Sequence, residues 1–310
     1  MIASSIVILP HGMRTKYPIV NQAVAPIIRY ASPHPEDIGS LSEDLMMIWE
    51  TLTLSKVLEN LRRNKIEPQG TLAFIDGPII DPPRELKAES KYYLSQILRS
   101  LEDVSSNTSD VGKLVEKFHE VRASIIKELL DEGVVVVGYV KRPFAESLLL
   151  KLLVKEGCAD LTQAEVFNGD KELAYALLMT SHHEFPKATK FIEYPMENEL
   201  YALHYAGRFR IVYSYLLNDL RSDISRVEIA IPKSFPHNIH NSQELLHAVL
   251  NNVVSLIPPG AGYPLPVILA HDKCSIRKGV AEILYEEVIT HGLSLETHDP
   301  TLLLMKLKMT

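Results

Sequence analysis

The chain has 310 residues, of which 46% are hydrophobic and 23% charged, and a formal net charge of -7. This composition is typical of a soluble globular protein with one large domain or two ordinary ones. The acidic balance argues against a surface that is basic all over. Any contact with nucleic acid must therefore come from a local patch or an internal channel.

Two cysteines, Cys158 and Cys274, occur without metal-like spacing or a secretory context, so a disulfide framework is not expected. The apolar opening of the chain lacks a basic region before it, and no later stretch is long and apolar enough to span a membrane. These features predict a cytoplasmic protein.

The first half of the chain alternates predicted strands and helices. Apolar runs predict strands at Ser5 to Leu9, Leu72 to Asp76 and Gly133 to Val140, the last buried on both faces. Helical periodicity predicts helices at Leu41 to Asn64, behind a capping box, and at Lys87 to Leu101 and Val111 to Leu130.

The second half adds an antiparallel section. Further helices are predicted at Phe144 to Glu156, Lys171 to Thr180, Ser242 to Leu256 and Arg277 to His291. Strands are predicted at Phe191 to Tyr194, Leu200 to Tyr205, Arg208 to Tyr215 and Val227 to Ile231, with Ala206-Gly207 as a hairpin turn. This mixture favours a single α/β domain with elaborations.

Asp76 is the first candidate functional residue, because it closes an apolar strand and is followed by Gly77. A glycine lets the backbone turn away, so that the carboxylate faces a crevice at the carboxyl end of the strand. Such an acid can hold a divalent cation. The alternative is an ordinary Asp-Gly turn.

Glu50 follows Trp49 on the first long predicted helix, beside the apolar stripe. A carboxylate buried there needs a partner or a metal ion. Periodicity alone favours the plainer alternative, in which Glu50 lies at the edge of the stripe and reaches water.

The stretch from Gly260 to Asp272 is the most specific signal, because its prolines fix an apolar strand or turn that ends at His271. Tyr263 is placed to position a water or a phosphate oxygen, and His271 to bind metal or move a proton. A lone histidine is more often a core or helix-capping residue, so that alternative stays open.

Other polar residues rank lower. Asp81 is a candidate supporting acid in ordinary Asp-Pro loop chemistry, and His182-His183 lack the spacing of a zinc motif. Glu120 and Arg122 are predicted on a solvated helix face. The chain has no phosphate-binding glycine loop and no nucleophile elbow, which disfavours an ATPase or a serine hydrolase.

Taken together, these motifs resemble the NurA family, nucleases of archaea and some bacteria with an RNase H-like core. Trp49-Glu50 and the residues after it are similar to the glutamate helix of the family, and Leu72 to Gly77 to its Asp-Gly strand. Val137 to Lys141 is similar to its strand ending in lysine, and Gly262 to His271 matches its Tyr-Pro-x-Pro and Ala-His signature. The four motifs occur in the family order and cover most of the chain.

The resemblance implies a role for each matching residue. Glu50, Asp76 and His271 would bind Mn²⁺ or Mg²⁺, Tyr263 would support catalysis, and Lys141 and Arg142 would face DNA phosphates. It also implies a homodimer that processes single-stranded or duplex DNA ends with a HerA-like hexameric ATPase. The whole chain, 1–310, would be one NurA-type domain with an RNase H-like mixed sheet.

One departure concerns the first family motif, a strand ending in an Asp-Gly pair whose aspartate binds metal. No aspartate precedes Asp37 in this sequence. We expect an N-terminally shortened nuclease rather than an inactive relative, because Glu50, Asp76, Tyr263 and His271 are all present. Loss of that carboxylate leaves fewer anionic ligands for metal, which predicts weak or absent activity.

Two other functions remain open. A chain without metal chemistry would act as a DNA-clamp or adaptor subunit of the translocase. An unrelated α/β metalloenzyme acting on small phosphoesters is the third alternative.

Overall fold

The computed structural model describes residues 2–8, 19–25, 48, 50–80, 111–141, 143, 148–157, 169–182, 184–196, 198–235 and 243–274. The predicted helices at Lys87 to Leu101 and Arg277 to His291 lie outside these ranges, as do the candidate residues Asp81 and Arg142. No helix in this part of the chain is long and apolar enough to cross a membrane.

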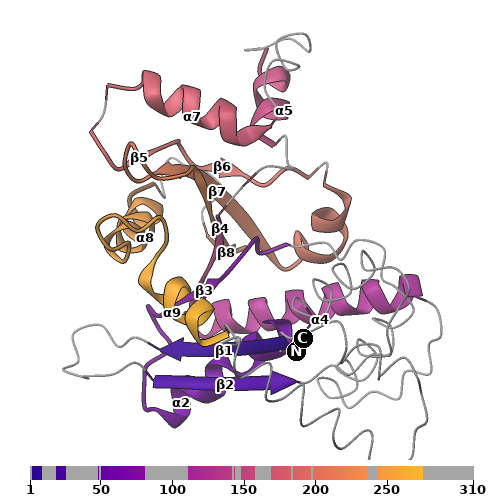
Figure 1. Cartoon of the computed structure of the whole chain (residues 1–310). Coiled ribbons are helices and arrows are strands. Elements are labelled where there is room, and N and C mark those ends of the chain that lie inside the picture. Colours follow the sequence, from indigo (N-terminus) through magenta and orange to yellow (C-terminus); the bar gives the residue numbers. More distant parts are fainter. Residues whose placement is uncertain are drawn as a thin grey trace, which may run out of the picture.

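Figure 1 shows the arrangement of the helices and strands. In chain order these are β1 (Ile2–Ile8), β2 (Ile19–Ala25), α2 (Val57–Arg63), β3 (Leu72–Ile75), α4 (Val111–Asp131), β4 (Val135–Val140), α5 (Leu148–Lys155), α7 (Asp170–Thr180), β5 (Lys187–Ala188), β6 (Ile192–Glu193), the π-helix η1 (Tyr201–Tyr205), β7 (Phe209–Leu217), β8 (Ser225–Pro232), α8 (Gln243–Ser255) and α9 (Leu265–Cys274). Residues 50–55 are also helical, and a turn at Lys56 separates them from α2.

A six-stranded mixed sheet forms the centre of the fold. Its strand order is β3-β4-β8-β7-β5, with β6 also paired to β7. The β3–β4 pair is parallel, whereas β4–β8, β7–β8, β5–β7 and β6–β7 are antiparallel. The predicted α/β class with an antiparallel section is therefore confirmed. The β-branched run of β4 lies in the interior of the sheet, as its composition predicts.

The sheet buries a separate apolar cluster on each face. One cluster joins the sheet to α2, α4, α5, α7 and η1, and includes Leu61, Ala123, Ile126, Leu149, Leu173, Tyr213 and Tyr215. The other joins it to α8 and α9, and includes Val137, Tyr139, Val212, Ile229, Leu250 and Val267. Helices on both faces give the layered architecture of an α/β protein.

The predicted N-terminal strand is confirmed but begins earlier, at Ile2, and ends at Ile8. Within the described residues it pairs with β2 in a separate antiparallel two-stranded sheet. This small sheet lies against α9 (Figure 1). Helix α9 carries His271, one of the candidate site residues.

The prediction of a strand at Leu200 to Tyr205 is wrong, because this segment forms η1. Asn198 starts the helical turn by accepting the Tyr201 amide on its side-chain oxygen at 3.0 Å. Tyr201 and Tyr205 are four residues apart and both buried, while Leu203 is exposed. That spacing puts both tyrosines on one helical face. The predicted Ala206-Gly207 hairpin is also wrong, since this turn joins a helix to β7.

The prediction of a strand or turn before His271 is wrong as well, because Leu265–Cys274 forms α9. Pro264 and Pro266 lie at the helix start, where a missing amide hydrogen costs little. The backbone amide of Ile268 donates to the Pro264 carbonyl at 3.1 Å. His271 therefore projects from a helix.

Candidate active site

The strand register puts Asp76 and Lys141 on the same face of the sheet. Phe74 of β3 pairs with Val137 of β4, and both contribute to the apolar cluster beneath α8 and α9. Because side chains alternate along a strand, Asp76 and Lys141 continue these two rows beyond the strand ends. The Lys141 ammonium lies 2.7 Å from Asp76 Oδ1 and 2.8 Å from Oδ2.

The chain turns sharply after Asp76, as the Asp-Gly pattern predicts. Gly77 has a φ of 153°, a conformation that side chains disfavour. The turn then passes closely over Gly138. A Cβ atom at Gly138 would lie 2.9 Å from the Gly77 carbonyl oxygen and 3.0 Å from the Ile79 nitrogen. A glycine on β4 is therefore needed for this close approach of the backbone.

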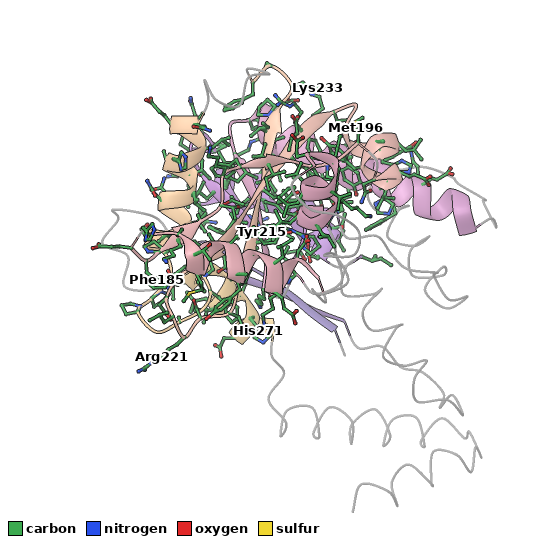
Figure 2. All side chains as sticks on the ribbon, turned by 90° about the horizontal axis from the view of Figure 1, so that it is seen from above. Phe185, Met196, Tyr215, Arg221, Lys233 and His271 are labelled. Carbon is green, nitrogen blue, oxygen red and sulfur yellow. The ribbon has the colours of Figure 1, made fainter. Side chains whose placement is uncertain are left out.

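His271 reaches the same carboxylate from α9. Its Nδ1 lies 3.8 Å from Asp76 Oδ2, and 67% of its side chain is exposed. Figure 2 shows His271 at the edge of the described part of the chain. Buried Val267, one turn earlier, packs α9 against the sheet. The structure thus brings together Asp76 and His271, which are almost two hundred residues apart in the sequence.

Tyr263 lies beside Lys141, whose ammonium is 5.2 Å from the centre of the tyrosine ring. Tyr139 of β4 holds this segment by donating its hydroxyl hydrogen to the Gly262 carbonyl at 2.9 Å. The hydroxyl also lies 2.8 Å from Ser225 Oγ, and the two tyrosine rings meet edge to face. Burial raises the pKa of Tyr139 to about 12, so it stays a neutral donor.

Glu50 lies on the α4 side of the sheet and does not gather with Asp76 and His271 into a three-ligand group. Its Oε1 accepts a hydrogen bond from Arg122 Nη2 at 3.1 Å. Arg122 also donates to Thr51 Oγ1 at 2.7 Å and to the Ile79 carbonyl at 3.1 Å. Glu50 is therefore linked to the Asp76 turn through Arg122. With 36% of its side chain exposed, it lies at the edge of the buried stripe.

Arg122 corrects a prediction, because the sequence places it on a solvated helix face and the structure buries it completely. Its neighbour Glu120 is exposed, as predicted. Sequence reasoning also missed Arg226 and Glu228, two buried charged residues on β8. Their signal was available: charges at alternate positions of an apolar strand are costly in a sheet covered on both faces.

Comparison with known proteins identifies the family. Residues 27–276 match the family model of the NurA domain. The chain belongs to the NurA family. Its fold is similar to the NurA nuclease from Sulfolobus solfataricus, with a TM-score of 0.51 and 14% sequence identity over 96% of this chain and 83% of that one. The curated proteins include no match to the chain.

Few side chains that could bind a metal ion lie close together in the described part of this NurA family member. No group of three or more His, Cys, Asp and Glu residues gathers closely enough there to hold a metal ion. The pair formed by Asp76 and His271 has suitable chemistry, because Mn²⁺ accepts both carboxylate and imidazole ligands. Such cations commonly take one or two carboxylates and complete their coordination with water and phosphate oxygens.

Proposed function

We propose that this NurA family chain is a divalent-metal-dependent nuclease that hydrolyses phosphodiester bonds at DNA ends. The observation that supports this most directly is the convergence of Asp76, His271, Lys141 and Tyr263 at the carboxyl ends of β3 and β4. Ligand sites in α/β sheets form at these strand ends.

Asp76 and His271 would hold Mn²⁺ or Mg²⁺, with water and phosphate oxygens completing the coordination, because Glu50 does not gather with these two side chains. When bound, the ion would offset negative charge on the scissile phosphate and lower the pKa of an attacking water. Tyr263 would orient the phosphate through its hydroxyl group. The alternative role of His271, in place of metal binding, would be that of a general acid or base, for which its side chain is accessible with 67% exposed.

Lys141 would contact DNA phosphates, together with Arg142 next to it in the sequence. Its ammonium contacts Asp76 and lies 5.2 Å from the centre of the Tyr263 ring. A cation at this position favours the backbone of DNA regardless of base sequence. Binding would therefore weaken as salt concentration rises.

The family also motivates a proposal about partners. The chain would form a homodimer in the cytoplasm and act on single-stranded or duplex ends delivered by a HerA-like hexameric ATPase. Sedimentation with and without such an ATPase tests both associations.

Cleavage assays with paired variants test the nuclease proposal. We expect Asp76→Asn and His271→Asn to lower Mn²⁺-dependent cleavage of end-labelled DNA by about 100-fold or more, because each removes a metal donor. Asp223→Asn is the matched control, since Asp223 also pairs with a lysine, Lys171, at 2.9 Å. Equal activity of Asp76→Asn and the control would refute the proposed site.

A non-catalytic adaptor that clamps DNA for the translocase is the second candidate. It is favoured by the contact of the Lys141 ammonium with both Asp76 oxygens and by the small donor set among the described residues. DNA-end binding and stimulation of the ATPase, without cleavage in Mn²⁺ or Mg²⁺, would support the adaptor over the nuclease.

A further inference from the structure

A row of four buried or half-buried charged side chains runs past Ile79, which lies three residues after Asp76, and the inner two bind its backbone. On one side, Glu228 Oε2 accepts the Ile79 amide hydrogen at 2.8 Å. On the other, Arg122 donates to the Ile79 carbonyl at 3.1 Å. The outer members are Arg226, which pairs with Glu228 at 2.8 Å, and Glu50, which pairs with Arg122. The charges alternate in sign along the row.

We propose that Arg122 and Glu228 are positioning residues, which fix the turn that carries Asp76 relative to Glu50 by binding both backbone polar groups of Ile79. This inference rests on the proposed nuclease function. It assigns a role to residues that lie behind the candidate metal donors. Neither residue needs to contact DNA or a cation.

The energetics favour such a role over simple stabilisation. Arg122 and Glu228 are both 0% exposed, and Arg226 is 1% exposed. Removing charges from water is costly, so a buried ion pair is often no more stabilising than apolar residues of similar volume. The arrangement is therefore better explained by what it orients, namely a turn with a functional carboxylate at its start.

Gly138 makes this arrangement possible. It pairs with Glu228 across β4 and β8 and with Ile75 across β3 and β4. Because Gly138 has no side chain, Ile79 can lie over β4 and its amide can reach the Glu228 carboxylate. The turn is thus restrained by β4 beneath it, by β8 through Glu228 and by α4 through Arg122.

A pair of double variants separates positioning from stability. Arg226→Met with Glu228→Met removes both charges together and leaves the Ile79 amide without its acceptor. Arg226→Met with Glu228→Gln also removes both charges, but keeps an amide oxygen that can accept from Ile79. Both variants carry the same loss of the ion pair, so a difference between them reports on the contact to Ile79.

Hydrogen exchange at the Ile79 amide is the direct measurement. In the variant with Arg226→Met and Glu228→Met, called Met/Met, we expect the exchange rate to rise by about tenfold or more without global unfolding. In the variant with Arg226→Met and Glu228→Gln, called Met/Gln, the rate should return toward that of the wild type. Mn²⁺-dependent cleavage should fall by about 10- to 100-fold in Met/Met and recover in Met/Gln, because misplacing catalytic groups by about 1 Å is costly.

Arg122→Lys tests the other side of the turn. Lysine keeps the buried positive charge but lacks the planar fork that contacts Ile79, Thr51 and Glu50 together. We expect weaker Mn²⁺ binding and slower cleavage than in Arg210→Met. Arg210 is the matched control, since it is a buried arginine that binds an acid, Glu193, at 2.6 Å and a backbone carbonyl, that of Phe235, at 3.4 Å.

The outcomes separate this proposal from the nuclease proposal. Unchanged Ile79 exchange in Met/Met, or the same exchange and cleavage in Met/Met and Met/Gln, would overturn the positioning role. If the wild-type chain cuts no DNA while Ile79 exchange rises in Met/Met and recovers in Met/Gln, the restraint on the turn stands and the nuclease proposal fails.

Discussion

The ammonium of Lys141 contacts both carboxylate oxygens of Asp76, at 2.7 Å and 2.8 Å. A divalent cation bound to Asp76 would compete for the same oxygens. Lys141 therefore has two proposed partners, the carboxylate before a cation arrives and the DNA phosphate afterwards. The side chains are 26% and 34% exposed, which limits the strength of their ion pair.

Replacing Lys141 by methionine separates these two partners. Exposed or half-exposed ion pairs contribute about 0.2–1 kcal/mol, so we expect Lys141→Met to tighten Mn²⁺ binding by up to about fivefold. The same change removes a phosphate contact, so DNA affinity should fall and its salt dependence should become shallower. Titration of free Mn²⁺ and DNA binding at several salt concentrations measure both effects.

Lys171→Met is the control for this prediction. Lys171 is 25% exposed and pairs with Asp223 at 2.9 Å, so it closely matches Lys141. The Lys171→Met variant should leave the affinities for Mn²⁺ and DNA unchanged. Weaker Mn²⁺ binding in Lys141→Met would show that the lysine does not compete with the cation.

Tyr139→Phe tests how the Tyr263 segment is held. The variant loses the hydroxyl that donates to the Gly262 carbonyl, so we expect about 1–2 kcal/mol of destabilisation and reduced cleavage. Ser225→Ala removes the other hydroxyl contact of Tyr139 and leaves Gly262 bound. Denaturant unfolding should show similar losses of stability in the two variants. Cleavage assays should show a larger loss of activity in Tyr139→Phe than in Ser225→Ala. Equal activity in the two variants contradicts the prediction.

Gly138→Ala tests the close approach of the Asp76 turn to β4. The new methyl group meets backbone atoms that cannot easily move, 2.9 Å and 3.0 Å away. We expect about 1–3 kcal/mol of destabilisation, measured by denaturant unfolding, and slower cleavage. Gly207→Ala is the control, because a Cβ atom there meets no heavy atom within 4 Å. Similar stability of the two variants would argue against a tight contact.

His119 makes stability depend on pH. Burial is the largest cause that lowers its pKa to about 3, and electrostatic interactions with His204 and Arg122 contribute to the same shift. The unfolded chain binds this proton below about pH 6.5, but the folded chain does not until about pH 3. The stability that the neutral ring provides is therefore complete above pH 6.5 and is lost as pH falls, by about 1.4 kcal/mol per pH unit.

His119→Phe should flatten this pH dependence of stability between about pH 6.5 and pH 3, the window set by the unfolded and folded pKa values. The variant also loses the contact between Nδ1 and the Tyr205 hydroxyl, so its stability should be lower at neutral pH. Denaturant unfolding at several pH values measures the slope. As a control, replacing exposed His182 by asparagine should leave the slope of stability against pH unchanged. The same unchanged slope in His119→Phe would show that His119 is not the source of the pH dependence.

Local patterns determined much of the fold in advance. The β-branched run predicts β4, helical spacing predicts α4, and the Asp-Gly pair places Asp76 at the end of β3. These features depend on residues close together in the chain. The pairing of Asp76 with His271 followed from the family motifs, because spacing alone does not bring distant segments together.

Tertiary structure decided what surrounds each side chain. Arg122 has the local pattern of a solvated helix residue, yet it is buried because the Asp76 turn and the Glu50 helix cover that face of α4. Tyr201 and Tyr205 favour a strand by composition, but packing against the cluster beneath α4 selects a helical turn. The sequence alone determined which groups carry charge and which segments are regular. Only the folded chain determined which charges face one another, because burial depends on neighbours distant in sequence.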